Sequence, residues 1–582
     1  MAQSSALPAS FDATDANVAT GPRGQLGHRD LIAHSDQFER RLWSPTSRVW
    51  SLVGNGLSNQ NFIEGPEGLI VIDTGESTQE MGWALSKIRE VTRAPIVAVM
   101  YTHFHYTGGT GAVFNDAGGK VPVWGHAGIV ANRQRMRSEV STAAGRGLIH
   151  QFGISLPAEG PDAVINVGLG EEFRRAEHAP FTNVLEPPDH TFDEPTTAVI
   201  AGLQVEITPA PSDADDSVTI WFPGLKVAIN NLVWPTLFNV FPIRGEEYRD
   251  PRILLDGLDH LAGLGAECLL GAHGVPLSGA DDIRREVTVY RDAIQYLWDQ
   301  TVRGLNQGLT VDELTQAVQL PEDSGRSELT RQFYGLVEHH VRQIHNGLRG
   351  WFDGHEALLF PTPPLERATR LIAGFGGQDA VRAQAQEALE AGDQRWALEL
   401  ASWLVRSEVD ATGRIDGGEV GDRKLLADVL RSIGQRTTSS NARNWCLTRA
   451  MELEGTLDLS RFRQHRFSPA DFDLEQNPAD FFVRSLRVMI DPERASGIGG
   501  SLRWDFEDGT TAGVRIRNCV AVPDDGAEAE TVIEIGRQTW TEVLCSKQTF
   551  DDALAAGTAQ ITGDETLGRL LLSCFDHPSL VT

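Results

Sequence analysis

The stretch VAVMYTHFHYTGGTGAV, residues 97–113, says most about the fold and chemistry of this chain. Residues 97–101 form a short apolar run, which is typical of a buried β-strand. His103 and His105 follow directly, and side chains two positions apart on an extended backbone point to the same side. Two imidazoles placed in this way can supply half of a metal site; a purely structural histidine pair is the alternative.

The composition limits which partners the protein can have. A length of 582 residues exceeds what one hydrophobic core organises, so two to four domains are expected. The formal net charge of −29 disfavours nucleic acid and anionic membranes, and an anionic substrate would need a local metal or arginine. No apolar run is long enough for a membrane span, and the N-terminus does not resemble a secretory signal. The five scattered cysteines predict reduced thiols, and hence a cytoplasmic protein.

The patterning predicts an N-terminal arm followed by three domains. Residues 1–44 begin with an Ala-, Ser-, Thr- and Asp-rich stretch that is typical of an extended or flexible segment. Strand-like runs with Gly and Pro punctuation dominate residues 45–280 and alternate with helical segments, which predicts an α/β domain. Between 281 and 460, apolar residues recur at helical spacing and predict an all-α domain. Residues 461–582 predict a small α+β domain.

Two predictions concern elements inside these domains. The long amphipathic helices expected between 281 and 352 could bury their apolar seam against a second copy of the chain, although packing within one chain explains the same pattern. In the last domain, residues 485–495, 500–523 and 531–545 alternate as antiparallel strands do, and two helical segments follow them.

Other candidate ligands also follow strand-like runs. The acidic cluster SDADDS, residues 212–217, precedes the strand VTIWFP. Because carboxylates join imidazoles readily at zinc, Asp213, Asp215 or Asp216 is a candidate third ligand; a solvated acidic loop is the alternative. His273 in CLLGAHGVP occupies a similar position, where it could act as a ligand or as a general acid or base.

From residue 45 to the end, the chain resembles the metallo-β-lactamase-type alkylsulfatases, the family of SDS hydrolases and inverting secondary alkylsulfatases. The segments that carry the resemblance are LSNQNFIEGPEGLIVIDTG, the HFH stretch, RGLIHQFGISLP, INVGLG, EPPDHTF, IRGEEYRD, GAHGVP, YRDAIQYLWDQTVRGLNQGLT, GLRGWFDG and NARNWCLTRAMEL. The resemblance implies an α/β domain with the αββα metallo-β-lactamase sandwich, an all-α dimerisation domain and a C-terminal α+β domain like sterol carrier protein 2 (SCP2). It also implies a homodimer.

The same resemblance implies a hydrolase that cleaves the sulfate ester of an aliphatic alcohol with water activated by metal. His103 and His105 match two ligands of the first of the family's two zinc ions, and Asp213 falls where the family has a glutamate. His273 matches a ligand of the second zinc ion, and Arg244 matches the arginine that binds sulfate.

Three further residues are candidates for the site, and the resemblance assigns two of them, Asp73 and Asn230. Asp73, which ends the run LIVIDTG, matches an aspartate that orients a histidine or a loop near the metal; a plain turn residue is the alternative. Tyr106 is a candidate acid or base beside the metal if the altered centre catalyses a different reaction. Asn230 stands where the family has a metal-bridging glutamate.

The chain departs from the family pattern around the second metal. The Asp-His pair that follows HxH is replaced by Thr107 and Gly108, the bridging glutamate by Asn230, and the glutamate ligand by the shorter Asp213. We therefore expect one zinc ion per chain, because the usual ligands of the second ion are missing.

Three functions remain open at this point. The first is a mononuclear hydrolase acting on a sulfate ester or a similar anionic ester of a small, amphiphilic molecule. The second is a lyase, or a hydrolase of a different small polar substrate, that uses the altered centre. The third is a non-catalytic binding protein whose C-terminal domain carries an apolar ligand.

Overall fold

The computed structural model describes residues 15–136, 140–246, 248–322, 324, 327–411, 413–460 and 479–580. The chain divides into two compact units, of which the first comprises residues 1–130 and 147–457 and the second residues 131–146 and 458–582. Helices α4 (Ile129–Met136) and α5 (Ser141–Phe152) carry the chain from one unit into the other and back.

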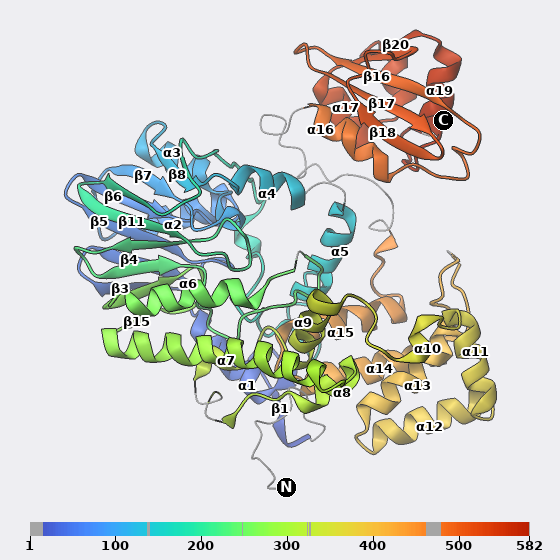
Figure 1. Ribbon diagram of the computed structural model, residues 1–582, viewed down its shortest axis with the longest axis horizontal. Coiled ribbons are helices and arrows are strands. Elements are labelled where there is room, and N and C mark those ends of the chain that lie inside the picture. Colours follow the sequence, from blue (N-terminus) through green and yellow to red (C-terminus); the bar gives the residue numbers. More distant parts are fainter. Residues whose placement is uncertain are drawn as a thin grey trace. The chain divides into compact units, whose positions relative to one another are not determined.

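Two β-sheets form the centre of the first unit (Figure 1). The seven strands of the first sheet are β3 (Arg41–Thr46), β4 (Val49–Val53), β5 (Gln60–Gly65), β6 (Gly68–Ile72), β7 (Ile96–Met100), β8 (Val123–His126) and β9 (His190–Phe192), in that order. The six strands of the second are β10 (Thr196–Ile200), β11 (Leu203–Pro209), β12 (Val218–Phe222), β13 (Val227–Asn230), β14 (Cys268–Gly271) and β15 (Leu277–Ser278). Strands β6 to β9 run parallel, as do β13 and β14, and the other neighbours pair antiparallel.

Helices cover the outer face of each sheet. One core lies between the sheets and includes Ile70 and Met100 from the first and Ile220 and Ile229 from the second. A separate core joins the other face of the first sheet to α2 (Thr78–Ile88) and α3 (Thr110–Ala117). Another core joins the second sheet to α6 (Pro251–Gly263) and α7 (Ala280–Asn306), which lie side by side in Figure 1. This layering is the predicted αββα sandwich.

The parallel strand pairs bring the predicted site residues to strand ends. Ile72 at the end of β6 pairs with Met100 at the end of β7, so Asp73 and Thr102 follow at the same edge of the sheet. In the second sheet Asn230 pairs with Gly271, which places the segment before His273 beside the end of β13. Loops at carboxyl ends of parallel strands are where α/β folds commonly place binding residues.

The predicted helical domain is present, and its first helix packs on the sandwich. The apolar face of α7 contacts α6, α8 (Val311–Ala317) and α9 (Val337–Arg349), so the seam of α7 is buried within one chain. Because α7 also contacts β14, residue 281 is no break between compact units. The remaining helices are α10 (Glu356–Leu359), α11 (Pro364–Gly374), α12 (Gln378–Glu390), α13 (Gln394–Arg406), α14 (Val420–Arg436) and α15 (Ser440–Glu454).

The described part of residues 1–44 differs from the extended arm that its composition suggested. Residues 15–44 include β1 (Val18–Thr20), β2 (Leu26–His28) and α1 (Arg29–His34). Leu31 and Phe38 are buried, and the buried Arg443 of α15 donates a hydrogen bond to the Leu26 carbonyl at 3.0 Å. A few apolar side chains therefore anchor a segment whose overall composition is polar.

The C-terminal part of the second unit is a five-stranded sheet with helices, as the α+β prediction required. Its strand order is β18-β17-β16-β19-β20, and only β16 and β19 run parallel. The strands are β16 (Gly500–Phe506), β17 (Thr511–Arg517), β18 (Val520–Asp524), β19 (Thr531–Ile535) and β20 (Ala559–Gly563); the helices are α16 (Ala479–Arg484), α17 (Arg537–Leu544), α18 (Phe550–Ala555) and α19 (Glu565–Ser573).

Two of the strand predictions in this domain were wrong. The stretch 485–495 begins as a 3-10 turn, Ser485–Val488, that continues from α16. The stretch 531–545 is a strand only as far as Ile535, and α17 then buries Trp540, Val543 and Leu544 on one helical face. In neither unit is any described helix long and apolar enough to cross a membrane.

Candidate metal centre

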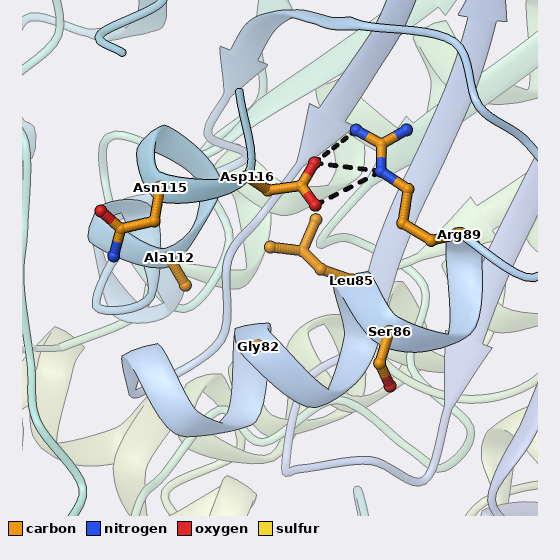
Figure 2. A pocket seen from close by; sticks show the side chains of 7 residues that line it. All are labelled: Gly82, Leu85, Ser86, Arg89, Ala112, Asn115 and Asp116. Atoms are coloured by element: carbon orange, nitrogen blue, oxygen red, sulfur yellow. Dashed lines mark hydrogen bonds and ion pairs between the residues drawn. The ribbon is translucent and has the colours of Figure 1, made fainter. Parts of the chain in front are cut away.

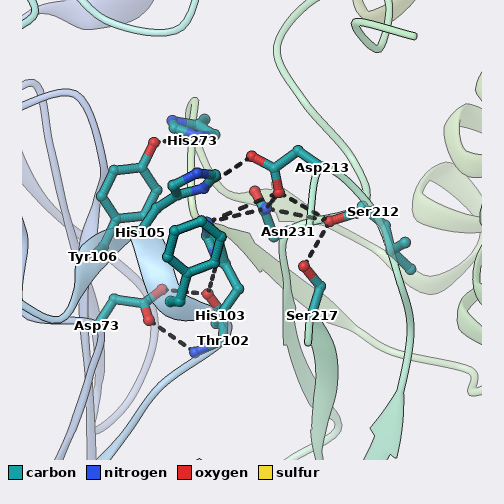
Figure 3. Close-up of polar contacts among 12 residues, drawn as sticks. Asp73, Thr102, His103, His105, Tyr106, Ser212, Asp213, Ser217, Asn231 and His273 are labelled. Carbon is teal, nitrogen blue, oxygen red and sulfur yellow. Dashed lines mark hydrogen bonds and ion pairs between the residues drawn. The ribbon is translucent and has the colours of Figure 1, made fainter. Parts of the chain in front are cut away.

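Three of the predicted ligands lie together at the edge of the sandwich (Figure 3). His103 and His105 belong to the turn after β7, and Asp213 belongs to the loop between β11 and β12. One candidate ligand atom from each lies within 4.8 Å of the others. His105 Nδ1 is 3.3 Å from Asp213 Oδ2, and His103 Nε2 is 3.9 Å from Asp213 Oδ1. Among the residues that the structure describes, this is the one group of three or more such side chains. Asp215 and Asp216, the other candidates in the loop, are not members of it.

A hydrogen-bond relay fixes the orientation of His103. The fully buried Asp73 accepts hydrogen bonds from the backbone N–H of Thr102 at 2.8 Å and from its hydroxyl at 2.6 Å. Because the hydroxyl proton goes to Asp73, Thr102 Oγ1 accepts from His103 Nδ1, which lies 2.8 Å away. His103 therefore carries its proton on Nδ1 and turns the Nε2 lone pair toward Asp213, which is the tautomer that a metal ligand needs.

The charges in the centre suit a bound cation. Burial lowers the pKa of His103 to about 3, so its imidazole is neutral at physiological pH. Burial opposes the ionisation of Asp213, but His103 and His105 hold the pKa of that carboxyl well below its usual range. A neutral imidazole and an ionised carboxylate are the protonation states in which these side chains bind metal.

Asn231, not Asn230, faces this group. The Asn230 side-chain oxygen accepts from the backbone N–H of Leu232 at 3.0 Å. The Asn231 amide nitrogen lies 2.5 Å from Asp213 Oδ1 and 3.3 Å from His103 Nε2. Trp234 Nε1 donates to the Asn231 side-chain oxygen at 3.1 Å, which sets the direction of the amide. Asn231 thus presents a donor, and not a carboxylate, to the centre.

Tyr106 and His273 form a neighbouring pair. His273 Nδ1 lies 2.9 Å from the Leu57 carbonyl, to which it donates, so His273 Nε2 is an acceptor. The Tyr106 hydroxyl lies 3.2 Å from that Nε2 and donates to it. Burial lowers the pKa of His273 to about 4, which keeps the ring neutral. His273, predicted as a ligand, is not a member of the three-residue group.

The backbone at Gly108 has no room for a side chain. A Cβ atom built there would lie 2.3 Å from Asn183 Nδ2 and 2.5 Å from the Glu76 carbonyl oxygen. The neighbouring Thr107 donates its hydroxyl to the Phe104 carbonyl at 3.1 Å. Neither position therefore offers a side chain of the kind that commonly binds zinc, because Gly108 has no side chain and Thr107 carries a hydroxyl in place of an imidazole or a carboxylate.

Arg244 lies in a polar cluster with residues that the sequence analysis did not single out. Its guanidinium pairs with Glu246, which also pairs with Arg249. Arg244 Nη1 is 3.5 Å from the Tyr334 hydroxyl. The Tyr334 ring stands edge-on to Trp234 at 5.6 Å, and Trp234 stands edge-on to His273 at 5.7 Å. Aromatic side chains therefore connect the arginine cluster to the candidate metal centre.

Sequence reasoning missed Thr102, Asn231, Trp234, Glu246, Arg249 and Tyr334. Two of them carried a local signal, since Thr102 directly precedes His103 and Asn231 follows Asn230. Glu246 and Arg249 stand in the same IRGEEYRD segment as Arg244. Trp234 and Tyr334 are brought to the site by folding alone.

A hollow elsewhere in the first unit is unrelated to this centre. Figure 2 shows it between α2 and α3, where Arg89 Nε donates to Asp116 at 3.0 Å. Its other lining residues are Gly82, Leu85, Ser86, Ala112 and Asn115. None of these residues belongs to the metal centre or to the arginine cluster.

Comparisons with known proteins match three successive parts of the chain to family models and most of its length to alkylsulfatases. The family model described as "Metallo-beta-lactamase superfamily" matches residues 53–229, "Alkyl sulfatase dimerisation" matches residues 310–456, and "Alkyl sulfatase C-terminal" matches residues 473–580. The linear primary-alkylsulfatase of a Pseudomonas strain is 33% identical over 88% of this chain and 98% of its own length. The (R)-specific secondary-alkylsulfatase of Pseudomonas sp. is 28% identical over 90% of this chain and 79% of its own.

The same relationship appears in three dimensions. The solved structure of a stereoselective inverting sec-alkylsulfatase from Pseudomonas sp. superposes with a TM-score of 0.81 and 25% sequence identity. The match covers 98% of this chain and 93% of that one. The order of domains, the sandwich fold and the sequence relationship all agree with the resemblance noted from the sequence, and the chain belongs to the alkylsulfatase family of metallo-β-lactamase-fold hydrolases.

Proposed function

We propose that this protein hydrolyses the sulfate ester of an aliphatic alcohol with a single zinc ion held by His103, His105 and Asp213. The observation that carries the proposal is the meeting of these three side chains, within 4.8 Å of one another, at the strand ends of a family member. The substrate class follows from the relatives, which act on linear primary or on secondary alkyl sulfates.

The residues present fit one zinc ion. Two imidazoles and a carboxylate are common zinc ligands, and catalytic zinc sites leave a further position for water or substrate. A bound zinc ion would supply Lewis acidity and lower the pKa of water toward neutrality. Thr102 orients His103 for this task, and Asn231 holds Asp213 by a hydrogen bond of 2.5 Å.

Three observations support one metal over two. Gly108 leaves no space for the histidine that the second metal of the family requires. The asparagines at 230 and 231 offer amides in place of a bridging carboxylate. His273 Nε2, the remaining second-metal ligand, accepts the Tyr106 hydroxyl proton at 3.2 Å.

The substrate is held by groups beside the metal ligands. Arg244 takes the sulfate group, because a guanidinium fork matches the oxygens of an oxyanion with two parallel hydrogen bonds. Tyr106 and His273 form the catalytic pair. The Tyr106 hydroxyl donates to His273 Nε2 in the free protein and would donate to the ester oxygen after turning away from that acceptor. In a chain with a net charge of −29, these groups supply the local attraction for an anion.

The protein works as a homodimer in the cytoplasm. The match of residues 310–456 to the alkyl sulfatase dimerisation model supports the dimer. Trp351 and Phe360 lie in that range with 69% and 89% of their surface exposed, which is unusual for large apolar side chains. All five cysteines are free thiols, which supports a reducing compartment.

Sulfate release tests the proposal. Zinc-loaded protein is incubated with dodecyl sulfate and with octan-2-yl sulfate, and free sulfate is measured by ion chromatography. We expect release from at least one ester and a loss of at least about 100-fold in His105→Ala, since Lewis-acid assistance is worth several kcal/mol. His260→Ala, at an exposed histidine of α6, is the matched control and keeps full activity. Absence of sulfate release from both esters by protein with verified zinc content would contradict the proposal.

A further inference from the structure

Glu246 bridges two arginines in the cluster beside the metal centre. Arg244 donates from Nε to Glu246 Oε1 at 2.9 Å and also from Nη2, while Arg249 donates from Nη2 to Glu246 Oε2. Both oxygens of one carboxylate are therefore engaged by two guanidinium groups. This pairing is the one that an oxyanion of a substrate would make.

The two arginines have anchors that do not involve Glu246. Arg249 Nη1 donates to the Asn239 carbonyl at 2.9 Å, and its side chain is 5% exposed. Arg244 has its Nη1 near the Tyr334 hydroxyl at 3.5 Å, and its backbone N–H donates to Gln151 at 3.2 Å. If the carboxylate left, the Arg249 guanidinium would keep its hydrogen bond to the Asn239 carbonyl, and Arg244 would keep its backbone hydrogen bond and the contact with Tyr334.

The Glu246 carboxylate can be replaced by an anion of the same charge. Its side chain is 18% exposed. Burial opposes ionisation of its carboxyl, but Arg244 and Arg249 lower its pKa and keep it ionised. Leaving the pair costs Glu246 its contacts with both guanidinium groups, and an incoming oxyanion would form the same contacts in its place.

The arginine pair is connected to the candidate metal centre by aromatic side chains. Arg244 Nη1 lies 3.5 Å from the Tyr334 hydroxyl, and the Tyr334 ring stands edge-on to Trp234, which stands edge-on to His273.

We propose that Glu246 is an internal competitor for the anion-binding site formed by Arg244 and Arg249, and that a sulfate group must displace it to bind. The proposal rests on the proposed function for the identity of the anion. Glu246 lowers the charge of the pair from two to one in the free protein, so it weakens the binding of every anion. Because this weakening is the same for free sulfate and for sulfate esters, the alkyl chain of an ester supplies the additional binding free energy that free sulfate lacks.

Binding measurements on three variants test this proposal. Isothermal titration calorimetry of the zinc-loaded protein uses inorganic sulfate and 1-octanesulfonate, whose C–S bond makes it a non-hydrolysable analogue. We expect Glu246→Gln to bind both ligands about tenfold more tightly than wild type, with a difference that shrinks as salt screens the charges. Glu246→Asp keeps the charge and stays close to wild type. Glu454→Gln, which removes a carboxylate from Arg431 away from the centre, changes neither affinity.

The outcomes separate this proposal from the proposed function. In one outcome, Glu246→Gln binds the two ligands no more tightly than wild type, while wild type releases sulfate from esters. Glu246 then positions the arginines and does not compete with the anion, so this inference is overturned and the proposed hydrolysis stands. If no variant binds either ligand, the inference is overturned as well. A wild-type protein that binds octanesulfonate, with the expected gain in Glu246→Gln, but releases no sulfate from any ester would uphold the inference and overturn the proposed hydrolysis.

Discussion

Thr102 connects the buried carboxylate of Asp73 to the imidazole of His103, the candidate zinc ligand, so it offers the most direct test of metal affinity at a single residue. Thr102→Val keeps the shape of the side chain but removes the hydroxyl that accepts from His103 Nδ1 at 2.8 Å. Loss of such a partner typically weakens metal binding by about 10- to 100-fold, and we expect the zinc affinity to fall by that factor in competition with a chelator.

The matched control for this substitution is Thr219→Val. Thr219 is also buried, and no hydrogen bond of its hydroxyl is found within the described structure. We expect its zinc affinity to equal that of wild type. Equal losses in both variants would show that Thr102 acts only through packing.

Gly108 provides a steric prediction. Gly108→Ala would place a methyl group 2.5 Å from the Glu76 carbonyl oxygen, so the backbone would have to shift. Overpacking of this kind costs about 1–3 kcal/mol, and we expect the free energy of unfolding in denaturant to fall by that amount. Gly119→Ala is the control, because nothing lies within 4 Å of its Cβ position. A neutral Gly108→Ala would contradict the steric account of the missing ligand.

At this scale the candidate ligands were easier to propose from the sequence than the residues that orient them. His103 and His105 were proposed from local pattern, because they directly follow a strand and carry imidazoles. Local pattern left three aspartates open, and the family resemblance singled out Asp213, which the structure places beside the two histidines. The sequence could not decide whether Asn230 or Asn231 faces the centre, because that depends on the residue at which β13 ends, and the two neighbouring residues are both asparagines. Trp234 lies close to His273 only because the end of β14 lies beside the end of β13.

At the scale of elements, the start of α2 holds a buried carboxyl that makes stability depend on pH. Glu80 accepts hydrogen bonds from Gln60 Nε2 at 2.8 Å and from the backbone N–H of Glu76 at 3.2 Å, and it is 4% exposed. Burial, with a smaller contribution from Glu76, raises its pKa from 4.5 to about 8. The folded protein therefore holds a proton here that the unfolded chain releases at lower pH.

The sign of the effect follows from the raised pKa. The stabilisation from Glu80 is fully present below its unfolded pKa of 4.5 and is lost as pH rises through about 8. As the pH rises from about 4.5 to about 8, we expect the melting temperature of wild type to decrease relative to that of Glu80→Gln. The glutamine amide has the same shape as the protonated carboxyl and does not titrate. Parallel pH profiles of the two proteins would contradict this role for Glu80.

The elements that could be predicted are those determined by neighbouring residues in the sequence, and the elements that could not be predicted depend on packing against distant segments. Helix α2 was predictable because Ser77 caps it and its apolar residues Met81, Ala84, Leu85 and Ile88 recur at helical spacing. The stretch 531–545 was misjudged because its early alternation was extended through Gly536. Trp540, Val543 and Leu544 have the spacing of a helical face, and packing against the C-terminal core selects the helix.

At the scale of the molecule, exposed apolar residues of the dimerisation region predict how the chain assembles. Trp351 and Phe360 are 69% and 89% exposed in the single chain, and we expect a dimer interface to cover them. Size-exclusion chromatography with light scattering should therefore show a dimer for wild type. The double variant Trp351→Ser/Phe360→Ser should shift the protein toward the monomer. Val199→Ser, at a residue 75% exposed on β10, is the control and stays dimeric. A double variant that remains fully dimeric would place the interface elsewhere.

The domain order was predictable from the sequence, whereas the compact units were not. Changes in periodicity near residues 281 and 461 mark changes in secondary structure. They do not say that α7 packs on α6 and β14, which joins the sandwich and the helices into one unit. Such packing depends on contacts between segments far apart in sequence, which local patterns do not record.

The central claim is that one metal ion is sufficient for catalysis. Protein stripped with a chelator is titrated with zinc while sulfate release and bound zinc are both measured. We predict that sulfate release reaches its plateau at about one zinc per chain and that about one zinc remains after desalting. Activity that continues to rise until about two zinc ions are bound per chain would contradict the claim.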